Sequence, residues 1–262
     1  MQNNACPTKE KEEKKSKKHL GIRDVRFVIA VGSGKGGVGK TTVSTLLALG
    51  LKELGYATGL FDLDFYGPNV PLFIGEKKPP MVEGRGNLKP IVVEGVRVMS
   101  LGLLLGEGDP IFMRGLMAGK LLQEFTEKVE WGPLDFLILD LPPGTGDIFL
   151  TMLDLFEMEG FVLVTTPHKL AISDAARTLA ILKEKQVPVL GVVKNMSDLF
   201  SEAGEHFEKF INKYKLSLVA EIPVLKSLAQ AESVEELLSD QTVMKLVEEL
   251  GEKISEKVFR IK

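Results

Sequence analysis

Short apolar runs alternate with longer amphipathic stretches along most of the chain. Each run is almost continuously hydrophobic, as is typical of parallel strands that are buried on both faces of a sheet. The runs cover residues 25–31, 57–61, 136–141, 161–165, 187–193 and 217–222. Helical periodicity covers residues 116–130, 148–156, 173–185 and 202–214. This alternation predicts an α/β fold, with a mainly parallel twisted sheet and helices on both of its faces.

Two segments depart from this alternation. Residues 84–105 contain turn signals between β-like runs, so we expect an inserted hairpin that leads into a strand over residues 96–101. Near the C-terminus, one helical face is apolar and carries Val243, Leu246, Val247, Leu250, Ile254, Val258 and Ile261. Such a face either packs on a sheet or lies on a membrane surface. Interspersed glutamates weaken attraction to anionic lipid, which favours packing on the sheet.

Composition and charge narrow the class of protein. With 262 residues, 44% of them hydrophobic, the chain can bury a large core, and we expect one domain over residues 21–262. Residues 1–20 are polar and charged, which predicts a disordered tail. A net charge of −3 gives no support for nucleic-acid binding. No apolar run has membrane-spanning length and the N-terminus lacks the apolar core of a signal peptide, so a cytoplasmic protein without a membrane partner is expected.

The first apolar run leads directly into a glycine-rich segment that matches the phosphate-loop pattern from Gly34 to Thr41. Glycines let backbone N–H groups surround a phosphate, and a helix that begins near Thr41 directs its positive dipole end at the same anion. Lys40 is expected to neutralise the β- and γ-phosphates, and the Thr41 hydroxyl to bind Mg²⁺. A flexible turn is the alternative, but the order of strand, loop and helix favours nucleotide binding. The expected nucleotide-binding residues of this loop are Gly34, Lys35, Gly36, Gly37, Val38, Gly39, Lys40, Thr41 and Thr42.

Acidic residues follow two further apolar runs. Asp62 and Asp64 come at the end of the second run, at the sheet edge where open α/β folds bind ligands. One carboxylate can hold Mg²⁺ through water while the other orients the attacking water; a polar turn is the alternative. Asp140 ends the third run, where phosphate-loop enzymes place a carboxylate for Mg²⁺. It is followed by an expected switch loop that consists of Pro142, Pro143, Gly144, Thr145, Gly146 and Asp147.

These motifs together resemble the deviant phosphate-loop ATPases, the group of MinD, ParA, ArsA and the nitrogenase iron protein. The early lysine that marks this group is matched by Lys35. Within the group, the chain most closely resembles the Mrp/ApbC family of iron–sulfur cluster carrier ATPases. The resemblance extends from about Gly21 to Pro223, and its specific matches lie at residues 64–71, 113–115, 131–132, 139–147, 164–167 and 195–197.

The resemblance implies a slow ATPase that uses Mg²⁺ and acts as a face-to-face homodimer. Lys35 would reach the nucleotide of the partner subunit and stabilise charge in the transition state. Asp64 would position the hydrolytic water, and Asn195 would contact adenine together with backbone near Pro223. The implied catalytic residues are Lys35, Lys40 and Asp64. The implied metal site consists of Thr41, Asp62 and Asp140.

The chain departs from this family at the cluster ligands. Members typically carry a CxxC pair shortly after the Asn-Met-Ser element, and the two pairs of a dimer hold one [4Fe–4S] cluster. Here residues 195–204 contain no cysteine, and Cys6 is the one cysteine of the chain. A disulfide within the chain and a multi-cysteine metal site are therefore excluded. Cys6 is either the remnant of an N-terminal cysteine cluster or a free thiol. Two Cys6 thiolates per dimer fall short of the usual four.

Three functions follow from these observations. The first is an ATPase for iron–sulfur protein maturation, which would act with scaffold or apo-protein partners. The second is a positioning or regulatory switch of the MinD/ParA type, which would bind a membrane, DNA or a protein. The third, a reductase similar to the nitrogenase iron protein, needs cysteines in the switch region, and none follows Cys6.

Overall fold

The computed structural model describes residues 22, 24–84, 86–104, 115–199 and 204–261. The expected tail at residues 1–20 and Cys6 lie outside these residues. In the described part of the chain, a central sheet has eight strands in the order β10-β9-β8-β1-β7-β2-β6-β5. The strands are β1 (Val25–Ser33), β2 (Thr58–Asp62), β5 (Ile91–Val93), β6 (Val96–Ser100), β7 (Leu134–Asp140), β8 (Gly160–Thr165), β9 (Val189–Asn195) and β10 (Leu218–Ile222). All neighbouring strands are parallel except β5 and β6, which confirms the predicted mainly parallel sheet.

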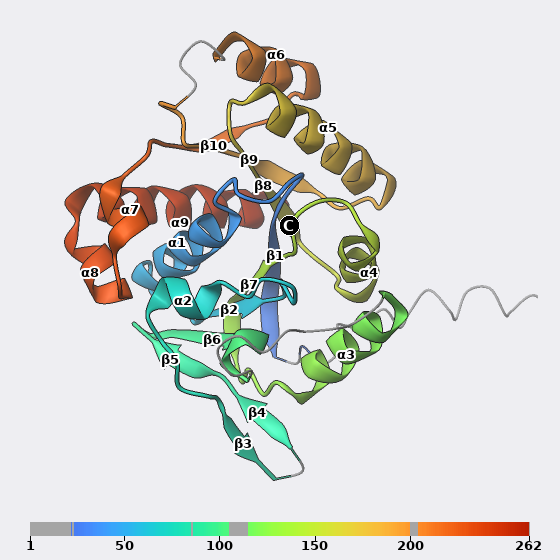
Figure 1. The fold of residues 1–262 in the computed structure, drawn as a ribbon, viewed down its shortest axis with the longest axis vertical. Coiled ribbons are helices and arrows are strands. Elements are labelled where there is room, and N and C mark those ends of the chain that lie inside the picture. The colour runs from blue at the N-terminus through green and yellow to red at the C-terminus, as the bar shows by residue number, and fades with distance from the viewer. Residues whose placement is uncertain (1–21, 23, 85, 105–114, 200–203, 262) are drawn as a thin grey trace, which may run out of the picture.

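Helices cover both faces of this sheet, as predicted (Figure 1). On one face lie α1 (Lys40–Glu53), α2 (Val70–Ile74), α7 (Lys226–Gln230), α8 (Val234–Ser239) and α9 (Gln241–Ile261). On the other lie α3 (Gly115–Lys128), α4 (Asp147–Leu155), α5 (Lys169–Glu184) and α6 (Gly204–Tyr214). The sequence did not predict α2, α7 or α8, because five or six residues are too few to show helical periodicity.

The sheet separates two hydrophobic cores, and β1 contributes to both. Phe27, Ile29 and Val31 pack with α1 and α9 on one side. Val28 and Ala30 pack on the opposite side with residues of α3 to α6. These five side chains are at most 1% exposed. Burial on both faces explains why the run is apolar at every position, and each large side chain contributes roughly 1.5–3 kcal/mol to stability.

The C-terminal apolar face was expected to pack on the sheet; it packs mainly on α1 and also contacts β10 and β9. Gly50 of α1 and Gly251 of α9 allow this close approach: a Cβ on Gly50 would lie 2.1 Å from the carbonyl oxygen of Val247. The residues of this face are buried except Ile261, which is 56% exposed. None of the described helices combines the length and the apolar character that a membrane crossing requires.

The expected insertion consists of two hairpins. Strands β3 (Met81–Glu83) and β4 (Asn87–Lys89) form a separate two-stranded antiparallel sheet, so the insertion begins before residue 84. The second hairpin joins β5 to β6 through Glu94 and Gly95, which both have positive φ, as a tight hairpin turn requires. The strand expected over residues 96–101 ends at Ser100, and a short 3-10 helix, η2 (Leu101–Leu103), follows.

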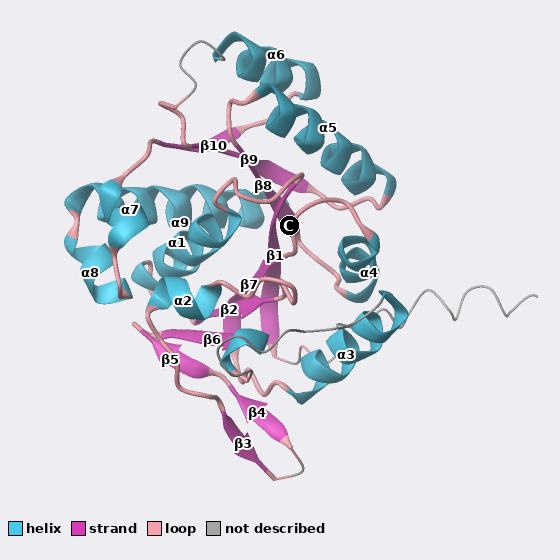
Figure 2. Ribbon diagram, viewed as in Figure 1, coloured by secondary structure: helices cyan, strands magenta, loops and turns pink. Residues whose placement is uncertain are grey.

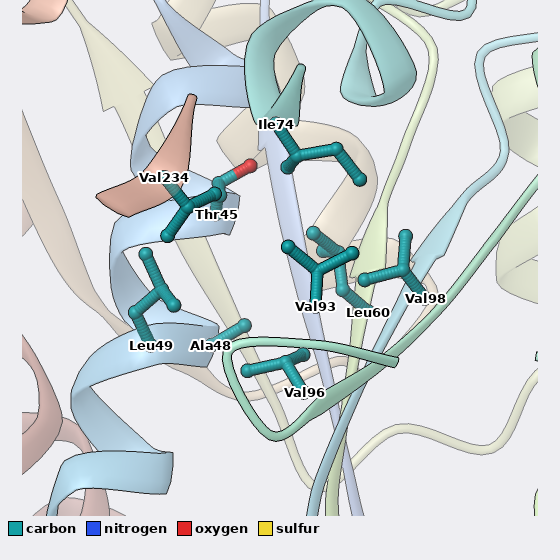
Figure 3. A pocket seen from close by; sticks show the side chains of 9 residues that line it. All are labelled: Thr45, Ala48, Leu49, Leu60, Ile74, Val93, Val96, Val98 and Val234. Carbon is teal, nitrogen blue, oxygen red and sulfur yellow. The ribbon is translucent and has the colours of Figure 1, made fainter. Parts of the chain in front are cut away.

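A small cavity lies between α1, α2, α8 and the strands β2, β5 and β6 (Figure 3). Its lining consists of Thr45, Ala48, Leu49, Leu60, Ile74, Val93, Val96, Val98 and Val234. Thr45 carries the one side-chain oxygen of this lining, and that oxygen already donates to the carbonyl of Thr41 at 2.9 Å. The cavity therefore offers no polar groups for a nucleotide and is a feature of core packing.

Candidate nucleotide-binding site

The chemistry-bearing residues lie at the carboxyl edge of the sheet, where the strands end. Figure 2 shows the loops that follow these strands. The strands β1, β7, β2 and β6 are neighbours and run parallel. Their register aligns Val31 with Asp140, Asp140 with Asp62, and Asp62 with Ser100. The fold therefore places the two predicted acids Asp62 and Asp140 side by side, although 78 positions separate them in sequence.

The phosphate loop connects β1 to α1 and is held by two neighbours. Gly39 has φ +84, and a Cβ there would lie 2.0 Å from Nδ2 of Asn195. A Cβ on Gly34 would lie 2.3 Å from a backbone atom of Asp174 in α5. Gly39 caps α1 without a side-chain hydrogen bond, so no capping side chain satisfies the first N–H groups of this helix. These donors and the helix dipole make the start of α1 suited to an anion.

Lys40 lies at the centre of a buried polar cluster. Its ammonium Nζ is 2.7 Å from Oδ1 of Asp140 and 3.9 Å from Oδ2 of Asp64. The Thr41 hydroxyl donates to the other oxygen of Asp140 at 2.8 Å. Lys40 is 6% exposed and Asp140 is fully buried. The structure thus brings together Lys40, Thr41, Asp64 and Asp140, which were predicted from separate motifs.

The cluster contains more negative than positive charge. Asp62, Asp64 and Asp140 are all buried beside the single ammonium of Lys40. Burial, and after it repulsion from Asp140, raises the pKa of Asp62 to about 7. Burial also raises the pKa of Asp64, and Lys40 acts against this effect. A divalent cation would offset the excess of negative charge.

The donor set fits Mg²⁺ held jointly by protein and phosphate. Carboxylate and hydroxyl oxygens are hard ligands, and Mg²⁺ usually binds one or two carboxylates together with substrate phosphates and water. Within the described ranges, no group of three or more His, Cys, Asp or Glu side chains is arranged to hold a metal ion alone. The arrangement therefore suits a metal that arrives with a nucleotide.

Asp62 is oriented toward the loop that follows β2. Its Oδ1 accepts from the backbone N–H of Asp64 at 3.1 Å, and its Oδ2 accepts from that of Val70 at 3.2 Å. Oδ2 also accepts from the Ser100 hydroxyl at 2.8 Å. Ser100 was not predicted, because a single sequence does not reveal that β6 lies beside β2. The predicted metal role of Asp62 stays a prediction.

The predicted switch segment lies against the phosphate loop. The backbone N–H of Gly144 donates to the carbonyl of Ser33 at 2.9 Å, and Gly144 has φ +86. Pro143 is exposed next to Gly36, with its Cγ 3.9 Å from the position of a Cβ there. Asp147 is the first residue of α4, so the loop itself ends one residue earlier than predicted. Movement of this segment stays a prediction.

The remaining predicted residues lie around the loop. Asn195 ends β9, is buried, and donates from Nδ2 to the carbonyl of Val38 at 2.9 Å. Pro223 directly follows Ile222, whose register partner is Asn195. Lys35 is half-buried, and its backbone carbonyl accepts from the Ser33 hydroxyl at 2.9 Å. The contacts of Asn195 and Lys35 with a nucleotide stay predictions.

This fold and this loop define a P-loop NTPase of the ParA and MinD type. A family model described as ParA, the NUBPL iron-transfer P-loop NTPases, matches residues 24–261. The chain belongs to this family. The match confirms the resemblance to iron–sulfur cluster carrier ATPases and supports it over the MinD-like alternative.

Curated relatives agree with this assignment. The iron–sulfur cluster carrier protein of Rickettsia felis is 38% identical over 225 residues, which are 86% of this chain and 70% of the relative. The protein of the same name from Aquifex aeolicus is 40% identical over 220 residues, 80% of this chain and 60% of the relative. That from Escherichia coli K12 is 38% identical over 227 residues, 83% of this chain and 62% of the relative. The chain thus spans roughly 60–70% of the length of these relatives.

Solved structures share the fold. A nucleotide-binding protein from Archaeoglobus fulgidus, in complex with ADP, superposes with a TM-score of 0.66 at 32% identity, over 89% of this chain and 90% of that one. The cell division ATPase MinD from Pyrococcus furiosus has a TM-score of 0.65 at 24% identity, over 88% and 98% of the two chains. The second likeness concerns the fold alone.

Proposed function

We propose that residues 21–262 act as one ATPase domain that binds and hydrolyses Mg·ATP in iron–sulfur cluster transfer. The observation that carries this proposal is the buried contact of Lys40 and Thr41 with Asp140, next to Asp64, at the start of α1. A buried ammonium and an uncapped helix start suit the phosphates of a nucleotide. Family membership supports the link to iron transfer.

Each residue of the cluster has a chemical role in this proposal. Lys40 turns its ammonium from Asp140 to the β- and γ-phosphate oxygens, and the N–H groups of the loop bind the same oxygens. Thr41 and Asp140, with Asp62 beside Asp140, would hold Mg²⁺, and the bound ion would neutralise charge on the phosphates. Asp64 accepts a hydrogen bond from the attacking water and so orients it. Asp64 suits this task because its carboxylate lies near the Lys40 ammonium without a close ion pair.

Asn195 favours adenine over guanine in this proposal. Its amide nitrogen donates to the Val38 carbonyl, so the amide oxygen is the group left to face a base. An oxygen acceptor pairs with the exocyclic amine of adenine and repels the carbonyl of guanine. The phosphate loop and the base would thus be held by one side chain.

Two chains are proposed to act face to face, with Lys35 of each directed at the nucleotide of its partner. A cationic side chain supplied across an interface stabilises the charge that develops during phosphoryl transfer. Lys35 lies just before the turn of the phosphate loop. It is only half-buried, so its exposed part can reach a partner subunit.

The thiolates that bind the cluster are proposed to come mainly from a partner protein, either a scaffold or an apo-protein client. Cys6 is the one cysteine in the sequence, and a [4Fe–4S] cluster usually takes four thiolates. The chain would then supply the nucleotide-dependent step and its partner the cluster ligands.

The test is ATP turnover by the parent chain and by Asp64→Asn. We expect Mg²⁺-dependent phosphate release from the parent and at least about 100-fold less from Asp64→Asn, with ATP affinity unchanged. Asp154→Asn is the matched control, since Asp154 is an exposed acid that pairs with Lys185. Equal turnover by Asp64→Asn and the parent would refute the role of Asp64, and a parent without turnover would refute ATP hydrolysis.

A further inference from the structure

Three polar residues form one row across the carboxyl edge of the sheet. Ser100 of β6 is the register partner of Asp62 in β2, and Asp62 is the register partner of Asp140 in β7. Ser100, Asp62 and Asp140 are 0%, 1% and 0% exposed. At this depth each hydrogen bond has a fixed partner, because water does not compete for it. Ser100 is hydrogen-bonded to Asp62, and Asp62 lies beside Asp140 on the neighbouring strand, so the row links β6 to the nucleotide site.

Asp62 closes the loop after β2 at both of its ends. One carboxylate oxygen accepts from the N–H of Asp64, where the loop begins, and the other from the N–H of Val70, where α2 begins. The carboxylate thus fixes the backbone on both sides of residues 65–69. Since Asp64 lies near the start of this loop and its N–H is bonded to Asp62, the direction of its side chain depends on how Asp62 is held.

Ser100 holds Asp62 from the other side. Its hydroxyl donates to Oδ2 of Asp62 at 2.8 Å and accepts from the backbone N–H of Gly102 at 3.1 Å. Gly102 in η2 also packs against the same loop, because a Cβ on it would lie 3.0 Å from Cβ and Cγ of Pro68. A hydrogen-bond chain and a close packing contact therefore both join η2 to the loop that carries Asp64.

We propose that Ser100 is a positioning residue for ATP hydrolysis: through Asp62 it sets the place of Asp64, and it couples that place to η2. This inference rests on the proposed function. Ser100 acts on Asp62 and contacts neither the nucleotide nor the attacking water. Its loss should therefore lower the rate of ATP hydrolysis far more than the affinity for ATP. In nucleotide chemistry a small displacement of a water-orienting group is costly, because in-line attack requires alignment.

The first experiment compares Ser100→Ala with Ser100→Thr. Alanine removes the hydroxyl and leaves Asp62 its two backbone donors, so the fold should persist while the loop loosens. We expect the kcat of Ser100→Ala to fall about tenfold, with the Kd for ATP within about twofold of the parent. Ser100→Thr keeps the hydroxyl and should restore most of the kcat. Thr126→Val is the control, since Thr126 is 1% exposed and its hydroxyl donates to Leu122 within α3, away from the site.

A second variant tests the same coupling without removing a hydrogen-bonding group. Gly102→Ala places a methyl group against the rigid ring of Pro68, so η2 or the loop must shift. We expect a lower kcat and an unchanged ATP Kd for this variant as well. Thermal melting of each variant separates loss of fold from loss of alignment.

The kinetic results distinguish the positioning role of Ser100 from ATP hydrolysis itself. A reduced kcat at constant Kd in Ser100→Ala and Gly102→Ala, with recovery in Ser100→Thr, supports the inference. Turnover in Ser100→Ala equal to that of the parent, or an equal loss in Thr126→Val, overturns it while ATP hydrolysis stands. An inactive parent chain refutes the proposed function itself, which is a distinct result.

Discussion

The carboxyl edge of the sheet contains two regions that differ sharply in chemistry. At the ends of β2 and β7 and at the start of α1, three acids and one lysine form a buried polar cluster. The segment after β9 is built differently: Asp198 is exposed and accepts from the N–H of Val224 at 2.8 Å, and Leu199 is 57% exposed. The first region suits the binding of nucleotide phosphates and Mg²⁺. The second offers oxygen and hydrocarbon where iron would need sulfur.

We infer from this difference that the nucleotide site and the iron–sulfur ligands need not lie in the same chain. The buried polar cluster forms where the register of β2 and β7 and the start of α1 bring its residues together. The segment after β9 is a surface turn, and its residue types can change at little cost to the fold. This agrees with the proposal that a partner protein supplies the thiolates for an iron–sulfur cluster.

Removal of the Lys40 side chain should cause the largest loss of ATP binding. Lys40→Ala deletes the charge that faces the phosphates, and we expect ATP affinity to fall at least about 100-fold, because several charge-assisted hydrogen bonds are lost. Isothermal titration calorimetry measures this directly. Lys52→Ala in the same helix is the control, since Lys52 pairs with the neighbouring Glu53 at the surface. ATP binding by Lys40→Ala close to that of the parent would mean that the nucleotide site lies elsewhere.

The buried charge of the first region should also make stability depend on pH. Burial and repulsion from Asp140 raise the pKa of Asp62 from 3.8 to about 7 in the folded chain. The folded chain thus binds this proton more tightly than the unfolded chain does, so the resulting stability is fully present below about pH 4 and is lost as the pH rises through about 7. Without added Mg²⁺ or nucleotide, we expect the free energy of unfolding to fall over this range, by on the order of a few kcal/mol from Asp62 alone.

Urea denaturation of the parent and of Asp62→Asn at a series of pH values measures this contribution. The amide of asparagine does not titrate, so the difference between the two chains should change between about pH 4 and pH 7. A difference that stays constant across this range would contradict the raised pKa of Asp62.

Asn195 belongs to both regions, because it is the last residue of β9 and its side chain contacts the phosphate loop. We expect Asn195→Ala to lower the ratio of ATP to GTP affinity about tenfold, since one base-directed hydrogen bond is lost. The ratio of ATP to GTP affinity reports on base recognition alone, because loss of the Val38 contact should lower the affinity for ATP and for GTP equally. Asn212→Ala, at an exposed position of α6, provides the control. An unchanged ratio would remove Asn195 from base recognition.

Much of the fold could be predicted from the sequence, because strands buried on both faces must be apolar at nearly every position. The run at residues 25–31 matches β1 closely for this reason. Helix boundaries were less predictable: α5 begins at Lys169, four residues before the predicted start, because the His168 side chain accepts from the N–H of Leu170 and caps the helix. Such a cap is a local contact with no periodic signal.

The site was partly predictable for a similar reason. Lys40, Thr41 and Asp140 belong to motifs whose chemistry requires those residues at those positions. Ser100 carries no motif, and its importance arises only because β6 lies beside β2. Which strands become neighbours is decided by the packing of the whole chain, so residues that act across a strand pair are hidden from one sequence.

Anaerobic reconstitution of the parent chain with iron, sulfide and Mg·ATP tests most directly whether the chain binds nucleotide without holding its own iron–sulfur cluster. After desalting, iron, sulfide, visible absorbance and bound ATP are measured on one sample, with Cys6→Ser alongside it. We predict one ATP per chain in both proteins and no stable iron–sulfur absorbance in either. About four iron atoms per two chains, with the absorbance of a [4Fe–4S] cluster, would show that the chain holds its own cluster and would contradict the account.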